Sequence, residues 1–253
     1  MKHHLSNGCS FSTNKPYLSC HQRLGQRLML EPTINLAKGG RGNDRILNTT
    51  MHWFLKNPER ITDTFVSVGW TTGFRWDYIS TQHPPLQWGS WHALFHDSFV
   101  HDKDVDLELA SAVKLYTNIL SLQYFLKYHK IPYVFYWALT NDLPENFPDL
   151  KLLKDGIDLN HFYNFKESDF ANENVRTSWG WDHFYNVKED DSANENVKMQ
   201  LDNRSSYVQS HFEYVAKNGW TKSASDGHPN MTGHHNWADN LYNFVQENKL
   251  CPK

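Results

Sequence analysis

Hydrophobic residues in this chain form short runs that alternate with longer stretches in which they recur at helical spacing. The short runs predict strands at residues 3–6, 33–36, 63–68 and 132–139. The longer stretches predict helices at residues 19–30, 43–55, 105–128, 206–217 and 236–247. Strands that alternate with helices form βαβ units around a largely parallel sheet. We therefore expect the α/β class, as a three-layer α/β/α sandwich.

Segments rich in glycine or small polar residues follow the first three predicted strands. They are residues 7–10 (Asn-Gly-Cys-Ser), 39–43 (Gly-Gly-Arg-Gly-Asn) and 69–72 (Gly-Trp-Thr-Thr). In open parallel sheets, ligands bind beyond the carboxyl ends of the strands, where such segments meet. This shared position is the main physical argument for a functional site at that edge.

The candidate catalytic residues are Ser10, Asp226 and His228. Ser10 follows the first strand, where amides of a following helix can stabilise an oxyanion. An acid close to a histidine can form the orienting and proton-accepting half of a catalytic triad, with the serine as nucleophile. Each part is weak alone, because a serine in a turn is usually a cap residue and the chain has 15 histidines.

The glycine-rich segment offers oxyanion donors. Its three glycines permit positive φ and close backbone approach, so the N–H of Gly40 can point at a ligand together with the Ser10 N–H and the Asn43 amide. An equally weighted interpretation is a plain turn in which Asn43 caps the next helix. A phosphate-binding loop is disfavoured, because the Gly-Lys-Ser/Thr ending is absent.

Together these segments resemble the SGNH (GDSL-like) hydrolase family. That family has a Gly-Asp-Ser block near its N-terminus, a glycine block after the second strand, an asparagine block after the third and a late Asp-x-x-His block. The resemblance implies that Ser10 is the nucleophile, Gly40 the second-block glycine, Asp226 the orienting acid and His228 the base, with no metal or organic cofactor. The Asn-Gly-Cys-Ser-Phe segment resembles SGNH-like proteins often seen in phages and bacteria.

The chain departs from this family pattern in three places. Cys9 replaces the Asp before the nucleophile, an acid that is not the proton relay. Asp226 precedes His228 by two residues rather than three, which leaves open a different loop geometry or another acid. The third block lacks its Asn, so Thr71 or Asn43 would have to supply that oxyanion donor; losing one typically costs about 10²–10³ in rate.

Residues 72–101 show no clean periodicity, and we expect a long loop rich in aromatic residues. Trp70, Arg75 and Trp76 are candidate substrate-binding residues, because aromatic faces beside the third block can stack on sugar rings. The alternative is a local hydrophobic core, since tryptophan is mostly buried in proteins.

Residues 161–175 recur at residues 183–197 with 12 of 15 positions identical. Two copies are too few for a solenoid. We interpret them as a tandem duplication in a surface insertion, at about residues 158–200 of a single domain spanning residues 1–253. A paired lid or a partner-binding arm is the alternative.

Composition narrows the partners and the compartment. The net charge of −3 and the absence of a basic block argue against nucleic acid. No apolar run approaches the roughly 20 residues of a membrane span, and the N-terminal residues do not resemble a signal peptide. The three scattered cysteines favour reduced thiols over disulfides or a zinc site. We expect a cytoplasmic protein, or one in the host cytoplasm or the virion if the source is viral.

The function these observations favour is a serine esterase acting on a small-molecule or polysaccharide ester, with a carbohydrate O-acetyl ester as the preferred substrate. The alternative from another class is a catalytically degenerate binding module or phage structural protein with the same fold. A metal-dependent hydrolase built on His228, His234 and His235 is a third, weaker alternative.

Overall fold

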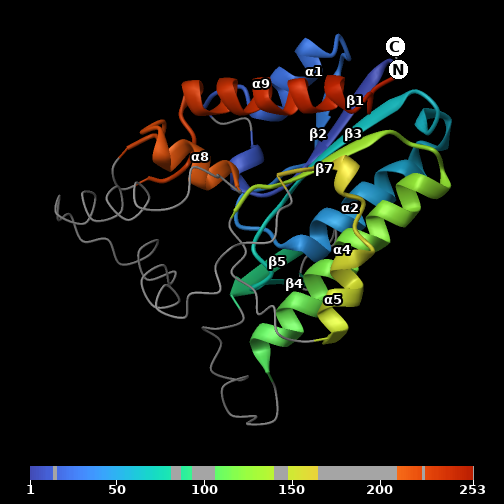
Figure 1. Ribbon diagram of the computed structural model, residues 1–253, viewed down its shortest axis with the longest axis vertical. Coiled ribbons are helices and arrows are strands. Elements are labelled where there is room, and N and C mark those ends of the chain that lie inside the picture. The colour runs from blue at the N-terminus through green and yellow to red at the C-terminus, as the bar shows by residue number, and fades with distance from the viewer. Residues whose placement is uncertain are drawn as a thin grey trace.

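Five parallel strands form the middle layer of a three-layer α/β/α sandwich (Figure 1). The computed structural model describes residues 1–13, 16–80, 87–92, 106–139, 148–164, 210–223 and 226–252. In sheet order the strands are β2 (Thr33–Asn35), β1 (His3–Asn7), β3 (Thr64–Trp70), β6 (Tyr133–Trp137) and β7 (Phe162–Tyr163). Every neighbouring pair is parallel. The chain reverses its direction of winding at β1, so a topological switch point lies between β1 and β3, where such sheets bind ligands.

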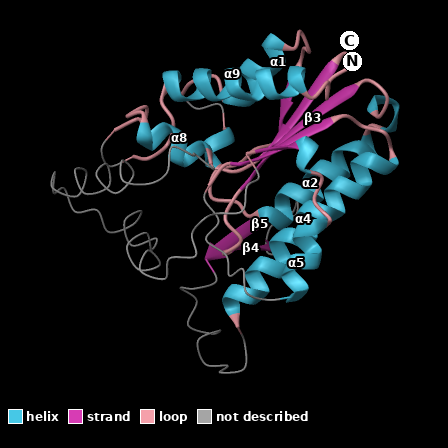
Figure 2. Cartoon of the chain, in the orientation of Figure 1, coloured by secondary structure: helices cyan, strands magenta, loops and turns pink. Residues whose placement is uncertain are grey.

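Helices cover both faces of this sheet (Figure 2). One layer contains α1 (Cys20–Arg27), α8 (His211–Lys217) and α9 (Met231–Glu247). The opposite layer contains α2 (Asn43–Lys56), α4 (Leu107–Tyr128) and α5 (Pro148–Asp155). The fold class predicted from the sequence is therefore confirmed.

Side chains alternate between the two layers along each central strand. On β6, Phe135 packs in the cluster with α2 and α4, whereas its neighbours Val134 and Tyr136 pack in the cluster with α1 and α9. On β3, Val66 and Phe65 divide in the same way. This period of two, in a strand buried on both faces, explains why the sequence shows continuous apolar runs.

The four predicted strands are present, and the predicted helices differ mainly in their ends. The last helix begins at Met231 rather than at residue 236, because the Asn230 side chain accepts a hydrogen bond from the Gly233 N–H and caps the helix there. The first helix begins at Cys20, where Ser19 is its cap, and ends at Arg27.

Part of the predicted long loop is instead a β-hairpin. Strands β4 (Arg75–Ser80) and β5 (Gln87–His92) pair antiparallel in a separate sheet. The expectation of a loop is wrong for these residues, because Trp, Tyr and Ile favour extended backbone even where alternation of polar and apolar residues is poor. Residues 81–86 and 93–105 lie outside the described part.

The first copy of the duplication contributes to the sheet. Its Phe162 and Tyr163 form β7, directly after the short 3₁₀ helix η4 (Leu159–His161). The Phe162 side chain is only 2% exposed and belongs to the core. The insertion expected from about residue 158 therefore has the wrong start, because a tandem copy can include a buried strand. The second copy lies outside the described residues.

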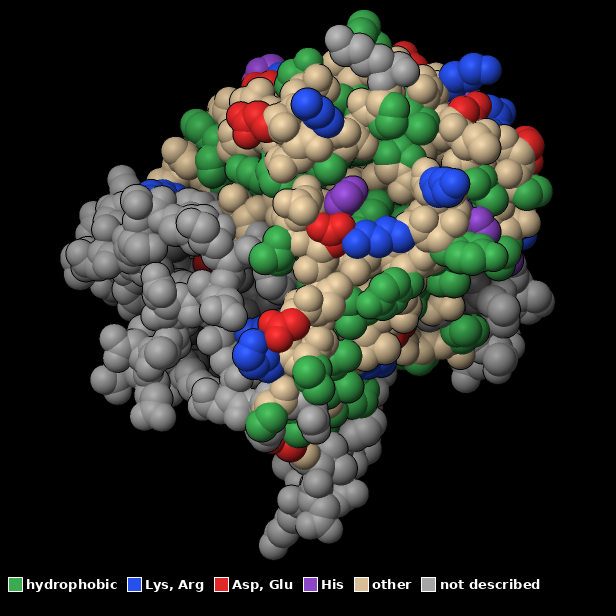
Figure 3. All heavy atoms as spheres, turned by 45° about the vertical axis from the view of Figure 1, so that its right-hand side comes forward, with side chains coloured by type: hydrophobic (Ala, Val, Ile, Leu, Met, Phe, Trp, Pro, Cys, Tyr) green, Lys and Arg blue, Asp and Glu red, His purple; other side chains and the backbone are tan. Residues whose placement is uncertain are grey.

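The surface and the helices bear on two further expectations. No helix in the described ranges combines the length and apolar character that crossing a membrane requires. On the face in Figure 3, the described Lys and Arg side chains are interspersed with Asp and Glu, without a patch of one sign. The prediction that nucleic acid is not a partner remains a prediction.

Candidate functional site

The carboxyl end of β1 leads into a tight turn that carries Ser10. Asn7 ends the strand, and its amide nitrogen donates to the Ile46 carbonyl at 3.0 Å, which fixes this strand end against α2. A Cβ on Gly8 would lie 2.4 Å from Ser12 Oγ and 3.0 Å from the Gly69 carbonyl oxygen. Only glycine therefore fits between β3 and the 3₁₀ turn η1 (Ser10–Ser12).

Ser10 is the partly exposed residue of this turn. Its carbonyl accepts hydrogen bonds from the Thr13 N–H at 3.4 Å and the Thr13 hydroxyl at 2.9 Å, which hold the turn closed. Within the described part of the chain, the Ser10 hydroxyl makes no hydrogen bond. Both residues after it are buried, so Ser10 is the residue of η1 whose hydroxyl can meet a ligand.

Asp226 and His228 form a hydrogen-bonded pair just before α9. His228 Nδ1 lies 2.6 Å from Asp226 Oδ1, and the His228 backbone N–H donates to the same oxygen at 3.0 Å. The antiparallel bridge between Thr221 and Pro229 and the bond from Lys222 N–H to the His228 carbonyl hold the loop. A spacing of two residues is therefore compatible with an Asp–His contact, which the departure from the family pattern had left open.

The two bonds from His228 also set the charge of the acid. Partial burial raises the pKa of Asp226, but the backbone and side-chain hydrogen bonds from His228 outweigh it, and the pKa lies below its usual value. Asp226 is thus ionised at neutral pH. An ionised acid on Nδ1 favours the tautomer with the proton on Nδ1, which leaves a lone pair on Nε2; the hydrogen positions are inferred from these contacts.

Phe11 connects the two ends of the chain. Its ring stacks on His228, with centroids 4.9 Å apart and planes at 28°. Because Phe11 directly follows Ser10, this contact brings the Asp226–His228 pair to the carboxyl end of β1. Ser10 and His228 share no hydrogen bond in this structure.

The glycine-rich segment after β2 lies beside the same turn. The Lys38 N–H donates to the Gly8 carbonyl at 3.2 Å, and a Cβ placed on Gly39 would lie 3.7 Å from Ser10 Cβ. Gly40 has φ of +67° and is exposed. The resemblance assigns the oxyanion role to Gly40, whereas Gly39 is the glycine whose Cα faces the Ser10 side chain.

Asn43 and Thr71 form hydrogen bonds with each other. The Asn43 amide nitrogen donates to the carbonyls of Thr71 at 3.0 Å and Thr72 at 3.1 Å, and its oxygen accepts from the Thr71 N–H at 3.0 Å. Both residues are buried. Their predicted role as oxyanion donors is therefore wrong in this structure, because these groups tie the start of α2 to the end of β3. Asn43 is the first residue of α2, so it is not the N-cap either.

Asp77 takes a role that the sequence gave no means to find. Its carboxylate accepts from the Gly42 N–H at 2.8 Å and the Arg45 N–H at 2.9 Å, at the start of α2. The N-cap Gly42 has no side chain, so Asp77 caps the helix from another strand. Asp44 returns a bond by accepting from the Asp77 N–H at 3.3 Å. The hairpin thereby fixes the glycine-rich segment.

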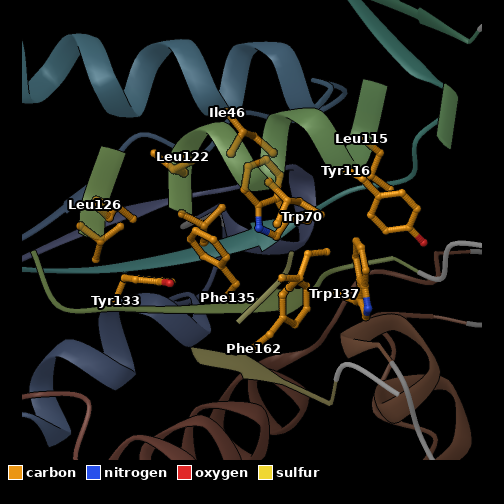
Figure 4. Packing of buried hydrophobic residues seen from close by; sticks show 14 of the residues in the cluster. Ile46, Trp70, Leu115, Tyr116, Leu122, Leu126, Tyr133, Phe135, Trp137 and Phe162 are labelled. Atoms are coloured by element: carbon orange, nitrogen blue, oxygen red, sulfur yellow. The ribbon is translucent and has the colours of Figure 1, made fainter. Parts of the chain in front are cut away.

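The three predicted substrate-binding residues lie in different surroundings. Trp70 is fully buried in the core beside Ile46 (Figure 4), so its predicted contact with substrate is wrong. Trp76 is partly buried on α4: its indole N–H donates to Ser111 Oγ at 3.1 Å, and Lys114 Nζ lies 4.7 Å from its ring centroid. Arg75 is partly exposed and donates to Thr71 Oγ1 at 3.3 Å.

A chain of polar groups crosses the interior between the sheet and α1. Ser67 Oγ lies 2.7 Å from His4 Nε2 and 2.6 Å from His21 Nδ1. Tyr136 Oη then contacts His21 Nε2 at 3.1 Å and Cys20 Sγ at 3.4 Å. All five residues are fully buried. Burial lowers the pKa of His4 to about 3 and lowers that of His21, so both rings are neutral.

The histidines proposed for a metal-dependent hydrolase do not come together. His228 pairs with Asp226, and His235 contacts Asp239 and Arg23 on the exposed side of α9. His234 points into the interior instead. There, one ligand atom from each of Cys20, His211 and His234 lies within 4.8 Å of the others, and all three residues are buried. Sequence reasoning missed this group, because its members are far apart in the chain.

Comparison with known proteins identifies the family. Residues 13–202 match the model of a family of unknown function, DUF6071, and the chain belongs to that family. A search of curated proteins found no significant match. The matched region begins after Ser10 and ends before Asp226 and His228, so membership of the family by itself assigns no role to these three residues.

Proposed function

We propose that this protein is a serine ester hydrolase, as the resemblance to SGNH hydrolases implies. Ser10 Oγ attacks the ester carbonyl carbon, and His228 Nε2 accepts the hydroxyl proton. Asp226 holds the His228 ring and stabilises its cationic form. His228 then returns the proton to the departing alcohol, and water, deprotonated by the same histidine, releases the acid from the acyl-enzyme.

One observation carries this proposal. The Asp226–His228 pair, with its 2.6 Å bond, comes from the C-terminal part of the chain. Its histidine ring nevertheless stacks on Phe11, the residue that follows Ser10. A histidine with a purely structural role in a loop does not require an ionised partner on Nδ1, and this one stacks on the residue that follows a partly exposed serine. The pairing matches the orienting contact that a general base requires.

The oxyanion donors are the backbone N–H groups of Ser10 and of Gly39 or Gly40. Because Asn43 and Thr71 bind each other, a third donor is missing relative to the three-block family pattern. Since one donor is typically worth about 10²–10³ in rate, we expect a slow hydrolase on simple esters.

For the substrate we propose an O-acetyl ester on a sugar or polysaccharide, and for the compartment the cytoplasm. A small acyl group such as acetyl suits the close approach of Gly39 to Ser10, where an added Cβ would lie 3.7 Å from Ser10 Cβ. Partly exposed Arg75 and Trp76 on the hairpin offer a polar and an aromatic group for the alcohol side. All three cysteines are free, which agrees with a reducing compartment.

A non-catalytic binding module is the second candidate, and it too has an observation in its favour. The Ser10 hydroxyl makes no bond to His228, and Asn43 and Thr71 are closed to a ligand. A protein that kept the fold but lost the reaction would still bind a ligand at the carboxyl ends of the same strands.

The test is hydrolysis of p-nitrophenyl acetate together with labelling by a fluorophosphonate. We expect wild-type protein to be labelled on Ser10 and to hydrolyse the ester, and Ser10→Ala and His228→Gln to lose both. His235→Gln is the matched control, because His235 lies on the same segment but half-exposed, next to Asp239. Its activity should equal that of the wild type.

Two outcomes decide between the candidates. Ester hydrolysis at the wild-type rate in folded Ser10→Ala protein would contradict the proposed mechanism. Folded wild-type protein that is neither labelled nor active on acetylated sugars would favour the binding module. Circular dichroism of each variant separates loss of chemistry from loss of fold.

A further inference from the structure

His211 is a buried polar residue whose ring nitrogens are poorly satisfied. Its side chain is fully enclosed, and neither ring nitrogen makes a hydrogen bond of normal geometry, although the backbone of Gly233 lies near enough to raise its pKa against the lowering by burial. The ring stacks on Trp237, with centroids 4.9 Å apart and planes at 8°. An unsatisfied buried polar group costs about 1–3 kcal/mol, and such groups in native proteins commonly mark a water or an ion.

Two further side chains that are able to ligate a metal ion lie close to this ring. Cys20 is the first residue of α1, His211 the first of α8, and His234 lies in the first turn of α9. One ligand atom from each lies within 4.8 Å of the others. The three helix ends are fixed independently: Ser19 caps α1, Ser210 and Glu213 form a capping box on α8, and Asn230 caps α9. The cluster is thus built on rigid elements rather than on a loop.

The chemistry of the three donors selects the kind of ligand. A thiolate and two neutral imidazoles form a soft sulfur and nitrogen set, which suits zinc and copper(I) and is poorly suited to calcium or magnesium. Zinc bonds of about 2.0–2.3 Å require ligand atoms roughly 3.5 Å apart. Closing the cluster onto an ion therefore needs side-chain shifts of about 1 Å.

We propose that Cys20, His211 and His234 form a buried binding site for one thiophilic metal ion, zinc or copper(I). The ion would give His211 a strong polar partner. It would also take the place of the thiol hydrogen in the contact between Cys20 Sγ and Tyr136 Oη, which are 3.4 Å apart. Binding would also release the thiol proton, because a coordinating cysteine is a thiolate.

The position of this site suggests a structural role behind the candidate catalytic pair. The Phe11 ring contacts both histidines: His211 edge to face, at 5.9 Å between centroids, and His228 in a stack, at 4.9 Å. Metal binding would therefore hold the first turns of α1, α8 and α9 together. It would also fix the surroundings of Phe11, on which His228 stacks. The site does not depend on ester hydrolysis, and it remains if Ser10 proves inert.

The experiment measures metal content and metal binding of the folded full chain in a Cys251→Ser background, which removes the one cysteine outside the buried layer. Elemental analysis after titration with zinc or with copper(I) under anaerobic conditions should give one equivalent of one ion, with a rise in unfolding temperature. Stoichiometric uptake of copper(I) alone, or of zinc alone, would identify which ion the site binds. Cobalt(II), as a probe for zinc, should give a thiolate-to-metal absorption band.

The variants separate this cluster from other metal-binding groups. His211→Gln and Cys20→Ala should each weaken binding by more than about 100-fold, beyond the 10–100-fold that an outer hydrogen-bond partner is worth. Cys9→Ala is the matched control, because Cys9 is also buried in this layer but is not part of the cluster; its affinity should be unchanged. Ser10→Ala should bind the ion as wild type does.

Two results would overturn the proposal. The first is folded wild-type protein that takes up neither zinc nor copper(I) stoichiometrically and shows no cobalt–thiolate band, a test that requires no variant to fold. The second is affinity in Cys20→Ala equal to that in Cys9→Ala.

Discussion

The two faces of the sheet are built differently. The face toward α2, α4 and α5 is packed almost wholly with aliphatic and aromatic side chains, such as Trp70, Leu122 and Phe135. The face toward α1, α8 and α9 also has an apolar cluster, but it encloses four fully or nearly fully buried histidines: His4, His21, His211 and His234. Among the described residues, only the second face encloses a group of buried histidines.

The difference shows which face of the fold tolerates substitution less. Apolar packing is tolerant, because hydrophobic residues of similar volume can replace one another. A buried polar network tolerates substitution poorly, because each polar group left without a hydrogen bond lowers the stability of the fold. The polar face lies directly behind the turn that carries Ser10 and Phe11, so the demanding side of the molecule is also the side next to the candidate site.

The largest expected effect breaks the apolar face. Phe162→Ala removes a ring that is 2% exposed at the edge strand β7, and we expect a loss of about 3–5 kcal/mol in the free energy of unfolding. Leu159→Ala, three residues earlier and 55% exposed, is the control and should change stability by less than about 0.5 kcal/mol. Equal, small losses in urea unfolding would mean that β7 is not a fixed part of the core.

The next effect breaks the polar face at its centre. Ser67→Ala leaves two buried imidazole nitrogens, on His4 and His21, without the hydroxyl that now lies 2.7 Å and 2.6 Å away. We expect a loss of at least about 2 kcal/mol in the free energy of unfolding, because each of the two unsatisfied nitrogens costs about 1–3 kcal/mol. Ser111→Ala, a buried serine on the other face with a single Trp76 contact, should cost less. A Ser67→Ala protein as stable as Ser111→Ala would contradict the importance of the network.

Acid should lower the free energy of unfolding through the buried histidines of the polar face. Burial lowers the pKa of His4 from 6.5 to about 3, so below pH 6.5 the unfolded chain binds a proton that the folded chain refuses. Stability is therefore full above pH 6.5 and falls as the pH drops toward 3, by about 2 kcal/mol for His4 between pH 7 and pH 5. Urea unfolding at these pH values measures the slope. A free energy of unfolding that does not change over this window would refute a neutral, buried His4.

The smallest expected effect on stability concerns the hairpin. Asp77→Ala removes the carboxylate that accepts from the Gly42 and Arg45 amides, at a cost of about 1 kcal/mol, as for an N-cap residue. If the proposed hydrolase is correct, the loosened glycine-rich segment should also lower the turnover number more than it changes KM. Hydrogen exchange of the two amides provides the structural readout. Unchanged protection in Asp77→Ala would show that the hairpin does not hold the segment.

Apolar periodicity was sufficient for most of the fold, but contacts between distant residues were beyond it. Residues 132–139 could be recognised as a central strand because β6 is buried on both faces and its sequence is continuously apolar. The hairpin β4–β5 was missed because the sequences of its strands lack strong alternation of polar and apolar residues. Phe162 was missed because a duplication suggested a dispensable insertion, although its ring is in the core.

The sequence by itself determined the α/β class, four of the five parallel strands and the small set of residues, Ser10, Asp226 and His228, from which a site could be built. These follow from local rules: the period of apolar residues and the chemistry of single side chains. The tertiary structure decided that Phe11 joins the pair to Ser10, that Asn43 and Thr71 satisfy each other, and that Cys20, His211 and His234 meet. These depend on which distant groups burial forces together, and a buried group is defined by its partners rather than by its neighbours in the chain.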